Sequence, residues 1–271
     1  MNLKVMVAFH KPFPLASADP VYLPIQAGRA LHAPIPGLIG DDTGDNISAK
    51  NPNYCELTAL YWGWKNLTAD FVGLIHYRRF FARHLPAGPA DRILRGKELA
   101  ERLARVPVLL PSPRRYFIET NRSHYIHAHH REDLETVQSV IRDLYPEYSA
   151  SFHRVMNRTG GHRFNMFIMR RDILDGYCRW LFGILFETEK RLDISGYSPY
   201  DARVFGFIAE RLLDVYFEHE KIPYRNGPTI HLESQHWDRK IYHFLRRKFF
   251  GGSGRGPGAS ARPNRKASPR R

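Results

Sequence analysis

The sequence predicts an α/β fold in which helices flank a mixed central sheet, and three stretches carry this prediction. Residues 3–9, LKVMVAF, form a short apolar run of β type. Residues 71–77, FVGLIHY, are apolar throughout, as expected for a strand buried on both faces. Between them, residues 57–64 repeat large apolar side chains at helical spacing, namely Leu57, Leu60, Tyr61 and Trp64.

The segment between the first strand and the helix contains no long helix of its own. Six prolines keep it extended or turning up to Ile39: Pro12, Pro14, Pro20, Pro24, Pro34 and Pro36. His10, Lys11 and Arg29 follow the first strand, where the carboxyl end of a parallel strand opens toward a ligand crevice. The helix itself is expected to be capped by Asn51 with Pro52, or by Asn53 with Glu56.

The rest of the chain alternates helices and strands. The patterns predict a surface helix over 90–105, a strand over 106–111, helices over 132–144 and 172–189, a turn and strand over 160–171, and a helix from near Pro199. Together they complete a single domain over residues 1–245.

The positive charge is concentrated at the carboxyl-terminal end. The formal net charge is +14. Residues 246–271 contain nine Lys or Arg and no acid, so residues 1–245 carry a net charge of +5. The Gly, Pro, Ser and Arg of this segment predict a disordered basic tail. Its possible roles are attraction to anionic lipid at about 1 kcal/mol per basic residue, nonspecific contact with nucleic acid, or solubility alone.

Two cysteines, Cys55 and Cys178, do not make a disulfide framework and favour a reducing cytoplasm. The sequence contains neither an apolar run of membrane-spanning length nor a signal peptide at its start. We therefore expect a cytoplasmic protein, with peripheral contact to the inner membrane through the tail.

Residues 40–56 form a loop rich in acids, amides and hydroxyls that leads into the helix at 57–64. A polar loop at a helix N-terminus can hold a small polar or anionic ligand, because free N–H groups and the helix dipole point at it. The alternative is an Asx-rich turn ahead of an ordinary core helix.

Four runs in this sequence resemble one bacterial family. They are GDDTGDNISAKNPNYCELTALYWGWKN at 40–66, GLIHYRRFF at 73–81, NMFIM at 165–169 and WLFGILFETEKRLDISGYSPYDARVFGFIAERLL at 180–213. The family is catalogued as domain of unknown function 4422, and the resemblance extends from about residue 4 to about residue 224. Its members are associated with capsular, exopolysaccharide and lipopolysaccharide synthesis and are taken to be glycosyltransferases.

The resemblance implies a Rossmann-like nucleotide-sugar transferase fold of the GT-A-like class. In many such enzymes the strand corresponding to 71–77 ends in an Asp-x-Asp motif that binds a metal. Here the place is taken by His76, Tyr77, Arg78 and Arg79. Arginines can neutralise a leaving diphosphate directly, so we expect a metal-independent enzyme without a cofactor. The alternative is that these arginines pair with Asp41, Asp42 or Asp45 and only brace the loop.

Roles follow for the candidate site residues. The expected donor-binding residues are His10, Arg29, Asp42, Asp45, Asn46, Asn53, Arg78 and Arg79. His76 would help to stabilise the leaving group, and Glu210 would deprotonate the acceptor hydroxyl if transfer inverts configuration; a retaining enzyme needs no such base. Asn165 and Arg203 are candidate acceptor ligands, although a buried Asn165 that satisfies backbone groups is an equal alternative.

A metal site is the less favoured interpretation of the histidine-dense stretch at 124–130. His127 with Glu132, or His124 with Asp133, has ligand chemistry, but the HxxxH helix spacing is absent. A polar lining for an acceptor groove, or surface histidines without a role, explains the stretch as well.

The leading functional hypothesis is a hexosyltransferase that moves a hexose from a nucleotide sugar to a lipid-linked oligosaccharide. The family's setting in polysaccharide gene clusters suggests galactose or galactofuranose. A non-catalytic sugar-binding or assembly subunit is the alternative. A nucleic-acid binder rests on charge alone, since no nucleic-acid motif is recognised.

Overall fold

A computed structural model describes residues 1–232, and the predicted basic tail at 246–271 lies outside the described residues. The strands that build the main sheet are β1 (Leu3–Phe9), β2 (Tyr22–Gln26), β3 (Ile39–Gly40), β4 (Phe71–His76), β5 (Arg79–Phe81), β6 (Val108–Pro111), β9 (Phe167–Arg170), β10 (Arg225–Gly227) and β11 (Thr229–His231). A separate two-stranded sheet pairs β7 (Arg114–Arg115) with β8 (Gly160–Gly161).

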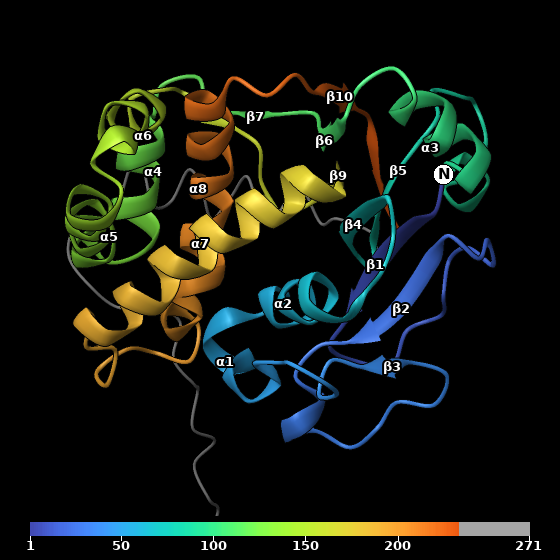
Figure 1. Ribbon diagram of the computed structural model, residues 1–271, viewed down its shortest axis with the longest axis horizontal. Coiled ribbons are helices and arrows are strands. Elements are labelled where there is room, and N and C mark those ends of the chain that lie inside the picture. Colours follow the sequence, from blue (N-terminus) through green and yellow to red (C-terminus); the bar gives the residue numbers. More distant parts are fainter. Residues whose placement is uncertain (233–271) are drawn as a thin grey trace, which may run out of the picture. The chain divides into compact units, whose positions relative to one another are not determined.

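The helices are α1 (Asn51–Tyr54), α2 (Leu57–Asn66), α3 (Gly96–Leu103), α4 (Asn121–Ala128), α5 (Arg131–Leu144), α6 (Ser149–Met156), α7 (Arg171–Arg191) and α8 (Val204–Glu220). Figure 1 shows α2 and α7 lying across the sheet. In this view α4, α5, α6 and α8 lie on the left, and α3 lies at the upper right. None of the helices within residues 1–232 has the length and apolar character needed to cross a bilayer.

The main sheet is mixed, as the sequence predicted. Its order is β10-β6-β9-β4-β1-β2-β3, and β5 and β11 extend from β4. β1 is parallel to β2 and β4, whereas β9 is antiparallel to β4 and β6. The carboxyl ends of β1, β2, β3 and β4 therefore meet at one edge of the sheet, where α/β folds hold their ligands.

The core lies on both faces of this sheet because its strands alternate. In β1, Met6 and Ala8 join the cluster formed by α2, α5, α7 and α8, whereas Val5 and Val7 face the cluster on the α3 side. Tyr61 and Trp64 of α2 pack against Phe182 of α7 at centroid distances of 5.0 and 5.9 Å. This packing fixes α2, and with it the loop at its start.

One predicted helix boundary is wrong for a tertiary reason, and another shifts slightly. The helix expected over 90–105 is only α3, because residues 92–94 pair with the strand region after β5 through Arg83 N to Arg92 O (2.8 Å) and Leu94 N to Phe81 O (3.0 Å). The helix expected from near Pro199 begins with a 3₁₀ turn at Asp201–Arg203, and α8 follows it.

The start of α2 also differs from the expectation. Cys55, at φ 52°, separates α1 from α2, and no side chain caps α2. Asn53 donates to Ala202 O at 2.7 Å, and the carboxylate of Glu56 accepts from Asn165. Neither predicted cap forms. Asn51 is the first residue of α1, with Pro52 in the first turn as expected, but its side chain donates to Cys55 O at 2.8 Å. The side chains of Asn53 and Glu56 bind distant partners instead.

Candidate active site

The turn between β4 and β5 places three predicted residues at the carboxyl edge of the sheet. His76 pairs with Arg79 across the turn, which leaves Tyr77 and Arg78 at its tip. Tyr77 is buried and stacks on Phe9, the last residue of β1, at 5.4 Å. His10 packs edge-on against the same Tyr77 ring at 5.2 Å. The sheet therefore presents His10, His76, Arg78 and Arg79 together.

A strained loop before β9 closes this cluster from the other side. Phe164 and Asn165 both have positive φ, 76° and 48°, a conformation that costs a non-glycine residue about 1–3 kcal/mol. Phe164 N–H donates to Glu210 Oε1 at 2.9 Å, and Phe164 O accepts from His76 Nε2 at 2.6 Å. Since Nε2 carries the proton in this bond, Nδ1 of a neutral His76 bears the free lone pair.

Glu56 is bound to the same loop. Its Oε1 accepts from Asn165 Nδ2 at 2.7 Å and lies 3.8 Å from His76 Nε2. Asn165 Nδ2 also donates to Gly206 O at 3.1 Å. Together with Cys55, three residues of positive φ thus converge on two carboxylates and a histidine, and strain of this kind is typical of functional sites.

The cluster is electropositive. Arg79 is half-buried, with its guanidinium 3.7 Å from the centroid of the Phe164 ring. Burial, followed by the positive charge of Arg78, lowers the pKa of Arg79 to about 10, and Glu210 and Glu56 oppose this only in part. Its Nε is buried and has no hydrogen-bond partner among residues 1–232. Such a guanidinium can accept an anion.

The positive charge of the cluster also affects the pKa of His10. Burial and then the charges of Arg78, Lys11 and Arg203 lower the pKa of its imidazole, so it is neutral at physiological pH. A neutral imidazole beside three cations can donate a hydrogen bond to a phosphate oxygen without adding charge.

The two carboxylates of the site differ in their freedom. Glu210 uses both oxygens, since Oε1 accepts from Phe164 N and Oε2 from Arg211 Nη1 at 3.0 Å. Glu56 uses Oε1 only, and no hydrogen bond to its Oε2 forms within residues 1–232. Glu210 was the base expected from the sequence. In the structure, however, Glu56 is the carboxylate that is more available to accept a proton.

Arg203 lies against the strained turn, where its Nε donates to Cys55 Sγ at 3.1 Å. Burial and the nearby Glu56 raise the pKa of Cys55 to about 11, despite the opposing charge of Arg203. The thiol is therefore protonated at neutral pH and unsuited to nucleophilic catalysis. Asn53 reaches this region only through its bond to Ala202 O.

Four other predicted donor residues lie at the end of β3. Arg29 pairs with Asp42 at 3.5 Å, Asp45 pairs with Lys65 at 3.5 Å, and Asn46 Nδ2 donates to Gly44 O at 2.9 Å. β3 is three strands from β4 in the sheet, a separation of about 14 Å. The predicted donor residues thus form two groups along one edge, as an extended ligand would require.

The bracing alternative for the arginines is wrong for these acids. Asp41 is fully buried and accepts from Gly28 N (2.9 Å), Arg29 N (3.1 Å) and Ser48 Oγ (2.5 Å). Asp42 and Asp45 have the partners given above. For Asn165 the structure favours the alternative of a buried side chain that satisfies a backbone group. Asn165 is only 1% exposed and donates to Gly206 O, so it braces the site rather than reaching a sugar.

The histidine stretch does not assemble the predicted ligand pairs. His127 Nδ1 contacts Glu119 at 2.6 Å instead of Glu132. Asp133 accepts from the hydroxyls of Tyr125 (2.8 Å) and Tyr197 (2.7 Å). In the described part of the chain, no group of three or more His, Cys, Asp or Glu side chains is placed to hold a metal ion.

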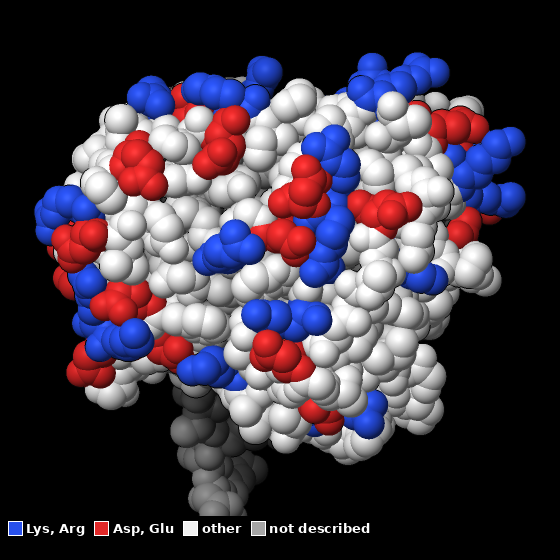
Figure 2. Space-filling view, viewed as in Figure 1, with Lys and Arg blue, Asp and Glu red and all other residues white. Residues whose placement is uncertain are grey.

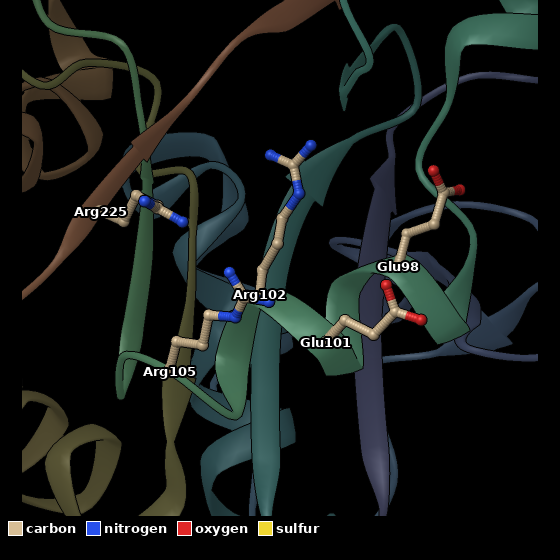
Figure 3. Close-up of a pocket in the computed structure, with 5 residues that line it drawn as sticks. All are labelled: Glu98, Glu101, Arg102, Arg105 and Arg225. Carbon is tan, nitrogen blue, oxygen red and sulfur yellow. The ribbon is translucent and has the colours of Figure 1, made fainter.

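A hollow of about 210 Å³ lies elsewhere on the surface (Figure 3). It is lined by Glu98, Glu101, Arg102, Arg105 and Arg225, which come from α3, the turn after it and the start of β10. α3 leads into the amino end of β6, so this hollow lies at the edge of the sheet opposite His76. Its lining mixes acids and arginines, without an ion pair between any two of these five described residues.

Sequence reasoning missed Glu56 and Phe164 as site residues. Glu56 stood inside the quoted run at 40–66, where it was interpreted as a helix cap. No local sequence pattern signals that Phe164 adopts positive φ, where its N–H donates to Glu210 and its carbonyl accepts from His76.

The comparisons agree with this fold. The sequence profile of a family described as a domain of unknown function (DUF4422) matches residues 4–221. No curated protein matches the chain. A solved structure described as the apo form of the bifunctional glycosyltransferase WbbM matches with a TM-score of 0.80 and 30% identity. The match covers 86% of this chain and 46% of the other, so the chain spans about half the length of that protein. The fold is the GT-A-like, Rossmann-like α/β fold that the family resemblance implied.

Proposed function

The chain belongs to the family described as domain of unknown function DUF4422, and on this premise we propose that it is a glycosyltransferase acting on a nucleotide sugar. The likeness to the bifunctional glycosyltransferase WbbM supports this reaction class. The observation that carries the proposal is the half-buried Arg79, whose charge is held among other cations with its Nε unpaired within residues 1–232. A nucleoside diphosphate is the ligand that such a cluster of cations fits.

The arginine turn would bind the diphosphate. During transfer, the acceptor oxygen becomes bonded to the sugar's anomeric carbon, the bond between that carbon and the diphosphate oxygen breaks, and the electron pair of the broken bond remains on the diphosphate oxygen. Arg78 and Arg79 neutralise the charge as it develops, and neutral His10 donates a hydrogen bond. Bound this way, the diphosphate requires no divalent cation. The group at the end of β3, Asp42 with Arg29, would hold the donor ribose.

The acceptor hydroxyl must lose a proton if the transfer inverts configuration. We assign this role to Glu56 in preference to Glu210, because Glu56 Oε2 is available whereas both oxygens of Glu210 are engaged. Glu210 then becomes a positioning residue that holds Phe164. A retaining transfer needs neither carboxylate as a base.

The finer parts of the proposal rest on the family's setting. The transferred sugar would be a hexose, with galactose or galactofuranose expected first. The acceptor would be a lipid-linked oligosaccharide at the cytoplasmic face of the inner membrane, in the synthesis of a surface polysaccharide.

The alternatives make different demands on the site. A non-catalytic sugar-binding subunit needs hydroxyl contacts but gains nothing from a half-buried arginine beside another. A nucleic-acid binder needs a continuous positive surface, whereas Figure 2 shows positive and negative side chains interspersed on the face viewed.

The test is a binding and turnover screen of the purified protein against nucleotides and nucleotide sugars, with Mn²⁺ or with EDTA. We expect one nucleoside diphosphate and its sugars to raise the melting temperature, equally in EDTA, and the matching sugar nucleotide to release diphosphate when an acceptor is added. Stabilisation that requires Mn²⁺ would overturn the arginine account. Binding without turnover on any acceptor would favour the sugar-binding subunit.

A further inference from the structure

The turn after β7 exposes two large apolar side chains. Phe117 is 84% and Ile118 is 66% exposed, the highest exposures among the large apolar residues within 1–232. They are adjacent and lie at the tip of the segment that joins β7 to α4. Adjacent large apolar side chains that are exposed together can form a contact site.

The tip is held in a strained conformation. Ile118 N–H donates to Tyr116 O at 2.7 Å, and Phe117 between them has φ 60°. This is a γ-turn with positive φ at its centre, a rare and strained form. Glycine or asparagine would suit the position better. Backbone strain and exposed apolar side chains therefore occur together at Phe117 and Ile118.

The flanks of the tip are rigid. β7 pairs with β8, and Tyr116 N–H donates to Thr159 O at 2.7 Å. The Tyr116 ring stacks on His124 at 3.9 Å, and its hydroxyl accepts from Arg163 Nε at 2.8 Å. Because both sides are anchored, the two apolar side chains are presented without an ordering cost on binding.

The surroundings of the tip are positive. Arg114 and Arg115 are exposed on β7, and Arg122 lies in the first turn of α4. The one acid between them, Glu119, contacts His127 at 2.6 Å. An apolar tip flanked by three arginines and one glutamate has net positive surroundings, and it complements an interface that is apolar inside and anionic outside.

The positive charge of β7 also acts on the candidate active site. Burial and neighbouring cations lower the pKa of Arg79, and Arg114 is one of those cations. Arg114 contributes in the same way to His124, whose pKa is lowered to about 3, first by burial and then by Arg211 and Arg163. Arg114 of β7 therefore adds to the positive charge at the site.

We propose that the β7–α4 turn docks on an anionic lipid surface, with Phe117 and Ile118 entering the interface and Arg114 and Arg115 contacting lipid phosphates. This docking stands apart from the proposed transfer. Only its purpose, to bring the candidate active site to a lipid-linked acceptor, rests on the proposed function.

The experiment is flotation of the full-length protein with vesicles of phosphatidylcholine containing about 30% phosphatidylglycerol, in low salt and in about 1 M NaCl. At about 1 M salt the Debye length is about 3 Å, so attraction through the tail or the arginines is largely screened. The test variant is Phe117→Asn with Ile118→Ser, since asparagine tolerates positive φ. The matched control is Leu85→Asn with Leu144→Ser, two other exposed apolar residues.

We expect the test variant to lose about tenfold or more of the vesicle binding that remains in high salt, and the control to keep it. Arg114→Gln with Arg115→Gln should weaken binding in low salt only. Equal binding by the test variant and the native protein would overturn the proposal. So would a change in oligomeric mass, or in acceptor KM alone, without loss of vesicle binding. Retained nucleotide binding in the test variant separates failure of docking from failure of the proposed function.

Discussion

Replacement of Asp41 by alanine should strongly destabilise the protein. Asp41 is fully buried and accepts three hydrogen bonds, from the backbone N–H groups of Gly28 and Arg29 and from the Ser48 hydroxyl. Alanine leaves these three donors without their acceptor. An unsatisfied buried donor costs about 1–3 kcal/mol, and the Ser48 hydroxyl can rotate to another partner. We therefore expect a loss of about 3–5 kcal/mol in the free energy of unfolding.

The assay is thermal and urea unfolding of Asp41→Ala, with Asp42→Asn as the control. For a domain of this size, the expected loss lowers the melting temperature by about 10 °C. Asp42 forms a half-exposed pair with Arg29 at 3.5 Å, so its removal should cost less than about 1 kcal/mol. It should nevertheless reduce stabilisation by the donor nucleotide. An Asp41→Ala protein within about 1 kcal/mol of the native stability would refute the reasoning.

Two further predictions concern the site and pH. Glu56→Gln should lower kcat by at least about 100-fold with little change in donor affinity, whereas Glu210→Gln should lower it less; the reverse order in steady-state kinetics would restore Glu210 as base. Burial, with the charge of Arg211, lowers the pKa of His129 to about 4. Between about pH 6.5 and pH 4, His129 is therefore protonated in the unfolded chain but neutral in the folded chain. Stability should therefore be unaffected by His129 above about pH 6.5 and fall by up to about 1.4 kcal/mol per pH unit from there toward pH 4. In urea titrations His129→Gln should reduce this slope, and an unchanged slope would contradict the assignment.

Local patterns were sufficient for the central strands and several helices. The apolar run at 3–9 is β1 in full, and the strand predicted over 71–77 is β4 at 71–76. The helix predicted over 132–144 is α5, at 131–144. In these elements burial and periodicity agree, so that the sequence alone specifies the structure.

Tertiary contacts decided the elements that sequence reasoning missed. Residues 92–94 leave the predicted helix because they complete pairing with Phe81 and Arg83, which are distant in the sequence. Cys55 interrupts the helix expected from Asn51, with Glu56 turned toward Asn165. Helical propensity contains no information about such partners.

The same reason limits prediction of the site. The cationic residues at the ends of β1 and β4 were foreseeable, because parallel strands bring their carboxyl ends together. The strained Phe164, the availability of Glu56 and the engagement of Glu210 depend on side-chain contacts between residues about 50 to 110 apart in the sequence.

The central claim, that Arg79 belongs to a diphosphate site, is tested most directly by calorimetric titration of the donor nucleoside diphosphate into Arg79→Gln and Arg105→Gln. Both variants lose one positive charge, but Arg105 lies by the hollow at the opposite edge of the sheet (Figure 3). We predict that Arg79→Gln weakens binding by about 10- to 100-fold, as expected for loss of a charge-assisted hydrogen bond, and that Arg105→Gln binds as the native protein does. Native affinity in Arg79→Gln would contradict the account.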